Sequence, residues 1–180
     1  MVMSILVFGQ TGQEQAWRGW LPLNSTEISD WIAGAVAELV AGQDGDGGWP
    51  CRTGDVSNTE ATSLAVLAIA AMQPASTALA AGIAFVRSLQ RTDGAFSISA
   101  ECPDYSWTTP LAALTLARHG EADAASLAVQ PLLTAPVFAL SPVPTDLYGY
   151  DTSIPGWPWT AGDYSFVEPT SLAAVFLKQQ

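Results

Sequence analysis

Apolar residues recur at helical spacing along most of this chain. Residues 28–41 and 76–90 combine an apolar stripe with polar positions on the opposite side, which predicts amphipathic helices that each bury one face. Residues 58–72 and 106–118 are apolar nearly all the way round, and a helix without a polar face must be covered on every side. The pattern therefore predicts amphipathic helices that alternate with almost wholly apolar ones.

Two of the helix starts carry the same sequence signal. Ser57 and Glu60 form a Ser-x-x-Glu capping box, and Ser165 and Glu168 form another. In a capping box each side chain satisfies a backbone amide that the first helical turn leaves free. We therefore expect helices to begin at Ser57 and Ser165, with both glutamates acting as structural caps.

The remaining segments complete the predicted organisation. A helix is expected over residues 122–134, although Pro131 lies near its end. Residues 135–156 hold four prolines without a period and predict a long loop, which in a compact domain is usually functional or mobile. Residues 1–27 read as an irregular N-terminal lead-in, so residues 28–180 are expected to form a single domain.

The chain also contains an internal repeat. Residues 48–65 return as residues 156–173 with eleven of eighteen positions identical and no gap. A weaker third copy runs from Gly94-Ala95-Phe96 through a longer loop to residues 106–112. Each copy joins a glycine-aromatic turn to the start of a helix, which indicates a helical repeat protein.

These turns carry a family resemblance. The run Gly82-x-x-Phe85-Val86-x-x-x-Gln90-x-x-x-Gly94-x-Phe96 resembles the marker of the prenyltransferase and squalene-cyclase repeat family, and a looser copy leads from Ala35 through Gln43 to Trp49. The resemblance covers about residues 28–180. It implies an all-α fold, an α/α toroid in which each turn joins an outer helix to an inner helix. With about three outer/inner pairs, this chain would supply half of an α6/α6 barrel.

Half a ring has a consequence for assembly. Its inner helices would be exposed at both open edges, and apolar surfaces of that size are unstable in water. We therefore expect a homodimer, or another partner that covers the edges.

Charge narrows the range of partners. Seventeen acidic residues against six basic ones give a net charge of −11, which disfavours a nucleic-acid backbone or an anionic membrane. No apolar run reaches the ~20 residues of a membrane-spanning helix. The apolar N-terminus lacks a basic n-region and a small-residue cleavage site, so a cytoplasmic location is expected.

The family's catalytic groups are largely missing. Its cyclases protonate their substrates with an aspartate-rich Asp-x-Asp-Asp-Thr-Ala motif at the start of an inner helix, where this chain has residues 58–63 with Glu60 as their only acid. A general acid of that kind needs neighbouring carboxyl groups or hydrogen bonds, and the sequence shows none around Glu60. Asp104, beside aromatic residues in the longest repeat turn, remains a weak candidate catalytic acid.

Metal and cofactor chemistry is not expected. The resemblance implies zinc ligands of the Asp, Cys and His types, but the inner-helix starts offer no cysteine and the only histidine, His119, lies at a helix end where it can cap carbonyl groups. Cys51 and Cys102 occupy corresponding turns of adjacent repeats and could be neighbours, but two cysteines do not form a disulfide framework.

The candidate ligand-pocket residues lie at the starts of the inner helices. In the family, aromatic walls stabilise isoprenoid cations. Trp49 and Trp157 occupy turn positions that pack between repeats, whereas Trp107 and Phe166 would line the mouth of a central cavity. The predicted pocket residues are Asn58, Glu60, Trp107, Phe166 and Glu168.

Three functions are compatible with this pattern. The first is a toroid without the standard catalytic motifs that binds a hydrophobic, isoprenoid-like molecule. The second is a protein-interaction or scaffold module without a small ligand. The third is a terpene cyclase of the protonation-initiated class, an isomerase or lyase, that uses an unconventional acid. The missing acids and zinc ligands favour the first two.

Overall fold

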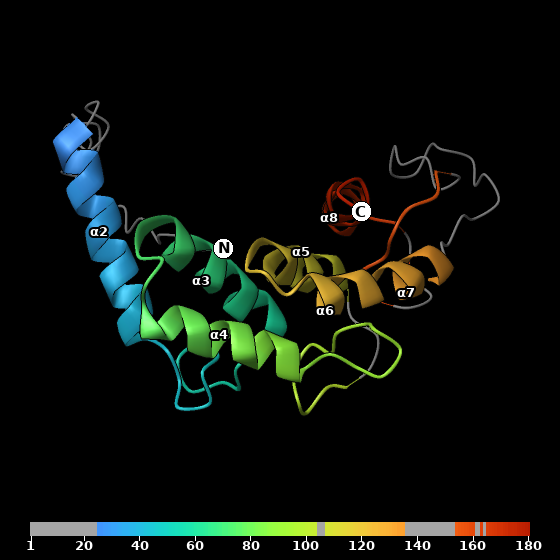
Figure 1. Ribbon diagram of the computed structural model, residues 1–180, viewed down its shortest axis with the longest axis horizontal. Helices are drawn as coiled ribbons and strands as arrows, with labels where there is room; N and C mark the ends of the chain where they lie inside the picture. The colour runs from blue at the N-terminus through green and yellow to red at the C-terminus, as the bar shows by residue number, and fades with distance from the viewer. Residues whose placement is uncertain (1–24, 104–106, 136–153, 161–162, 164) are drawn as a thin grey trace, which may run out of the picture. The chain divides into compact units, whose positions relative to one another are not determined.

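The computed structural model describes residues 25–103, 107–135, 154–160, 163 and 165–180. In this part of the chain all regular elements are α-helices, which confirms the all-α prediction (Figure 1). The helices are α2 (Ser25–Ala41), α3 (Thr59–Met72), α4 (Thr77–Ser88), α5 (Thr109–Arg118), α6 (Ala122–Leu127), α7 (Val129–Thr134) and α8 (Val167–Leu177). The chain divides into two compact units, Met1–Ala35 and Val36–Gln180.

Helix α5 is the centre of the second unit. It contacts α3 and α4 on one side of the fold and α6 and α8 on the other, and Figure 1 shows it between α3 and α8. Every residue from Thr109 to Leu116 is buried. Pro110 lies in the first turn, where the missing amide costs little. The mostly apolar sequence of this helix thus agrees with its burial on all sides from Thr109 to Leu116.

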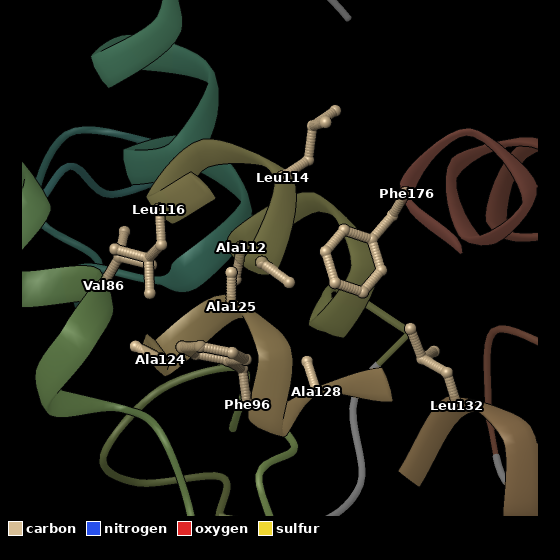
Figure 2. Packing of buried hydrophobic residues seen from close by; sticks show 11 residues of the cluster. Val86, Phe96, Ala112, Leu114, Leu116, Ala124, Ala125, Ala128, Leu132 and Phe176 are labelled. Atoms are coloured by element: carbon tan, nitrogen blue, oxygen red, sulfur yellow. The ribbon is translucent and has the colours of Figure 1, made fainter. Parts of the chain in front are cut away.

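One continuous hydrophobic cluster joins α4 to α8. Figure 2 shows Phe176 reaching from α8 toward α5, with Leu132 of α7 close by. Phe96, from the turn after α4, is also fully buried in this cluster. Burying one such side chain contributes about 1.5–3 kcal/mol. The cluster therefore fixes how the later helices and the turn between them pack.

Helix α3 departs from the expectation that an apolar helix is covered on every side. Its contacts come from α4 and α5, and Val66 and Ile69 are fully buried between them. Leu64 and Met72 keep 53% and 47% of their surface exposed. One apolar side of α3 is therefore open to solvent.

Helix α2 also buries less than its pattern predicts. It begins at Ser25, and Val36 is its buried residue. Trp31 keeps 71% of its surface exposed. The expected buried face is found only toward the C-terminal end, where the Trp49 indole donates a hydrogen bond to the carbonyl of Leu39.

The helix predicted over residues 122–134 is broken into α6 and α7. The break has a local cause, because a proline ring clashes with the carbonyl four residues earlier and provides no amide for it. Pro131 is four residues after Leu127, the last residue of α6. Gly94 packs against the Leu127 carbonyl, where a Cβ atom would overlap it, and has a φ of 90°. The absence of a side chain at Gly94 thus lets the turn pack closely against the end of α6.

The other predicted elements agree more closely. Helices α4 and α5 lie within the predicted ranges, and Arg87 and Ser88 of amphipathic α4 are exposed while Leu79 and Val86 are buried. The predicted long loop falls mostly on residues 136–153, and the predicted lead-in on residues 1–24, which lie outside the described residues. Within the described residues, no helix has the length and apolar character needed to cross a membrane.

Candidate functional site

The three sequence copies share one anchoring hydrogen bond. In each copy the backbone amide of the turn aromatic donates to a threonine hydroxyl thirteen residues later: Trp49 to Thr62 at 2.9 Å, Phe96 to Thr109 at 3.1 Å and Trp157 to Thr170 at 2.9 Å. The bond ties each turn to the first part of the helix that follows it. It confirms the internal repeat, including the weaker middle copy.

The glutamines of the turns also have a shared role. The side-chain amide of Gln43 donates to the carbonyls of Gly47 and Ala78, and that of Gln90 donates to the carbonyls of Gly94 and Ala124. Each glutamine therefore skips the helix that follows its turn and joins the turn to the helix after that one, α4 for Gln43 and α6 for Gln90.

The turn tryptophans are structural, as predicted. The indole of Trp157 donates to the carbonyl of Leu132 at 3.1 Å, as the indole of Trp49 does to Leu39 at 2.7 Å. Trp49 is 4% exposed, and Trp157 packs against the main cluster. Both residues hold neighbouring repeats together.

The anchoring threonines define equivalent positions in the three repeats. Two residues before each threonine lie Glu60, Trp107 and Glu168. They stand at or just before the starts of α3, α5 and α8, and α5 contacts both of the other helices. The repeat thus places three of the predicted pocket residues at the same end of three helices packed in a row.

Aromatic rings gather at this end of the helices. Trp107 and Trp159 meet edge to face, with ring centroids 4.1 Å apart and an interplanar angle of 72°. Trp159 also lies 6.4 Å from Phe166, which is 42% exposed. Paired rings of this kind contribute about 0.5–1.5 kcal/mol beyond the area they bury. We call Trp107, Trp159 and Phe166 the aromatic trio.

Sequence reasoning missed Trp159. Its counterpart in the first copy is Cys51, so it marks a difference between two otherwise similar stretches. That difference could have indicated Trp159 as a site residue. Residues that maintain the repeat are shared between copies, whereas residues that belong to a site can differ between copies.

The two predicted capping boxes are wrong. Ser57 forms an isolated antiparallel bridge with Pro50, and its hydroxyl donates to Asp46 at 2.9 Å, so it belongs to the turn. Helix α3 begins at Thr59 and is capped by Asn58, whose side-chain oxygen accepts from the amide of Ala61 at 2.9 Å.

The second box fails for the same reason. Ser165 bridges to Pro158, and its hydroxyl donates to the carbonyl of Ile154. The N-cap residue of α8 is Phe166, without a side-chain capping bond. Both serines lie in extended backbone, so each helix begins two residues after the serine that was predicted to start it.

Glu60 and Glu168 are therefore available for other roles. Within the described part of the chain, neither carboxylate takes part in a hydrogen bond or an ion pair. The pKa of Glu60 is raised, first by burial and then by the negative charge of Glu168. The two carboxyl groups thus interact across 108 positions of sequence, and the inference that Glu60 lacks a carboxyl neighbour is wrong.

Asn58 has a separate environment. Besides capping α3, its side-chain amide donates to the sulfur of Cys51 at 3.2 Å. Both residues line an open depression of about 480 Å³, together with Ile98, Ser99 and Glu101. Trp107 and Phe166 do not line this depression. Asn58 is therefore a capping residue beside a different surface.

The other sequence candidates contribute less. Asp104 lies outside the described residues. His119 ends α5 through its backbone amide, while its Nε2 atom is buried without a hydrogen-bond partner. Burial, and secondarily Arg118, lowers the pKa of this histidine. Cys51 and Cys102 are free thiols. Over the described residues, no three His, Cys, Asp or Glu side chains gather as metal ligands would.

Comparisons of the chain with protein-family models and with curated proteins found no match.

Proposed function

We propose that this chain is a partial α/α toroid that binds a hydrophobic molecule where α3, α5 and α8 begin. In this proposal α3, α5 and α8 are inner helices, as the family resemblance implies, and a second copy of the chain covers the open edges. The observation that supports ligand binding is the aromatic trio, which gathers residues from two repeats at one end of the helix row.

Exposed apolar side chains on α3 and α8 favour an apolar ligand. Val167, next to Phe166, is 87% exposed, and Leu64 lies one turn after Glu60 on the open side of α3. A molecule that covers such side chains gains about 25 cal/mol for each Å² of apolar surface removed from water. The free protein leaves this surface in water, so a hydrophobic ligand has a clear source of binding free energy.

Cyclase chemistry is less well supported. A raised carboxyl pKa makes Glu60 a weaker proton donor than an ordinary glutamate, whereas protonation of an alkene requires a strong one. The carboxyl pair therefore favours binding over alkene protonation. The protein-interaction alternative would use the same exposed surface, and a small-ligand titration separates the two.

The test is a calorimetric titration with farnesol and geranylgeraniol, two uncharged isoprenoid alcohols. We expect saturable binding, weakened about tenfold by Trp107→Ala because the ring contacts are lost. Trp31→Ala is the matched control, since Trp31 is exposed on α2 and should leave the affinity unchanged. Absence of binding for both alcohols would refute the proposal. Light scattering at micromolar concentration tests the second copy, and a monomeric mass would exclude it.

A further inference from the structure

We propose that a second copy of the chain docks head to tail on this one, with the α8 edge of one copy packed against the α3 edge of the other. The α3 edge consists of Ala68 and Met72, and the α8 edge consists of Ser171, Ala174 and Val175, all of which are exposed. This inference rests on the second copy in the proposed function and specifies the surfaces through which the two copies meet.

Helix α5 shows how a helix in the middle of the row of α3, α5 and α8 is covered. Its anchoring threonine is Thr109, and we compare the positions four and six residues after it, Ala113 and Thr115. These positions lie on nearly opposite sides of a helix with about 3.6 residues per turn. Both residues are fully buried, so α5 is covered on both sides.

The two outer members of the row lack this cover on opposite sides. In α3, Val66 lies four residues after the anchoring threonine and is fully buried, whereas Ala68, six residues after it, is exposed. In α8 the pattern is reversed, because Phe176 at the sixth position is fully buried and Ala174 at the fourth position is exposed. Each end of the row therefore exposes the side that the other end buries.

The buried sides show which neighbour each side fits. Val66 of α3 is buried between α4 and α5, the next helix of the row. Phe176 of α8 reaches toward α5, the previous helix of the row, in the cluster that also contains Ala113 (Figure 2). The fourth position thus faces the next helix, and the sixth position faces the previous one.

A head-to-tail contact continues this arrangement from one copy to the other. The α8 edge exposes the side that faces a next helix, and the α3 edge exposes the side that faces a previous helix. Packing one edge against the other repeats the contacts already present between α3 and α5 and between α5 and α8. A contact between two α3 edges, or between two α8 edges, would not reproduce any contact within the row.

The chemistry of the edges suits a second copy of this chain. Four of the five edge residues are apolar, and removing apolar surface from water contributes about 25 cal/mol for each Å². None of the five is charged, although the chain has a net charge of −11. Two copies can therefore meet at these edges without placing like charges in direct contact.

The test measures the dissociation constant of the dimer by light scattering over a concentration series. Ala68→Glu places a carboxylate on the α3 edge, and Ala174→Glu places one on the α8 edge. We expect the parent to dimerise and each variant to raise the dissociation constant by more than about tenfold, because docking would bury an unpaired charge. Ala84→Glu, at an exposed position of α4, is the matched control and should keep the parent's affinity. Circular dichroism checks that the variants are folded.

An equimolar mixture of the two edge variants distinguishes a head-to-tail contact from a symmetric one. Ala68→Glu keeps the parental α8 edge and Ala174→Glu keeps the parental α3 edge, so these two edges can still dock. We expect the mixture to associate more tightly than either variant alone. A mixture that associates no more tightly than the separate variants would overturn the inference. So would a weakening caused by only one of the two substitutions, because edges of one kind would then pair with each other.

The outcomes separate this inference from the proposed function. If the parent dimerises and neither edge variant weakens the dimer, the inference is overturned and the second copy remains. A parent that is monomeric at every concentration would overturn both the inference and the second copy. Binding of the isoprenoid alcohols is a separate readout, because Ala68 and Ala174 lie about two turns beyond the helix starts where the ligand is proposed to bind.

Discussion

Gly82 offers a sharp test of how α4 packs on the first repeat. A Cβ atom at this position would lie 2.6 Å from Cγ2 of Val66 and 2.9 Å from Cζ3 of Trp49. Neither neighbour can easily move, because Val66 is fully buried and the Trp49 indole is hydrogen-bonded to Leu39. Gly82→Ala therefore forces the helix away from the turn.

The magnitude follows from two opposing effects. Overpacking of a core costs about 1–3 kcal/mol, and contacts this short belong in the upper part of that range. Replacing glycine by alanine inside a helix stabilises it by about 0.8–1 kcal/mol. We expect Gly82→Ala to lower the free energy of unfolding by about 1–2 kcal/mol.

Urea unfolding followed by far-UV circular dichroism measures this change. Gly34→Ala in α2 is the control, because no atom other than those of its chain neighbours and its own helix backbone lies within 4 Å of the Cβ position there. It should leave the free energy of unfolding unchanged or raise it by up to about 1 kcal/mol. If Gly82→Ala is as stable as the parent protein, Trp49 and Val66 do not pack against α4 as described.

Two further predictions use the same assay. Gln90→Leu should lower the free energy of unfolding by about 1–3 kcal/mol, because the carbonyls of Gly94 and Ala124 lose their hydrogen-bond donor. The control Gln73→Leu changes an exposed glutamine and should have little effect. Equal effects of the two substitutions would contradict this role of Gln90. The raised pKa of Glu60 means that the folded state binds its proton more tightly than the unfolded state, so this contribution to stability is present below pH 4.5 and is lost as the pH rises through the raised pKa. The Glu60→Gln variant should therefore have a higher free energy of unfolding than the parent at neutral pH but not below pH 4.5. Glu38→Gln is the control. A stability difference between Glu60→Gln and the parent that does not change with pH would refute the electrostatic cause.

Helix positions could be predicted well because their signal is local. Sustained apolar runs mark α3 and α5, and amphipathic spacing marks α4, so each was placed within a few residues. The helix starts were misplaced because the Ser57 hydroxyl is bound by Asp46 from an earlier turn. A local capping motif cannot reveal such a competing partner.

The candidate site was predictable only in part. Trp107 and Phe166 follow from their places at helix starts, but their link through Trp159 depends on how two repeats pack. The same holds for Glu60 and Glu168, whose interaction arises when α3 and α8 pack on either side of α5. The identity of these residues could therefore be predicted from sequence, but their proximity depends on tertiary packing.

The threonine anchor has a consequence for how such a protein could change over evolution. The hydroxyls of Thr62 and Thr109 maintain their turns from fully buried positions, while the variable position two residues earlier bears none of these anchoring bonds. Mutations at that position therefore leave the anchoring hydrogen bonds intact. Each repeat can therefore vary this side chain independently while the framework of anchored turns stays unchanged.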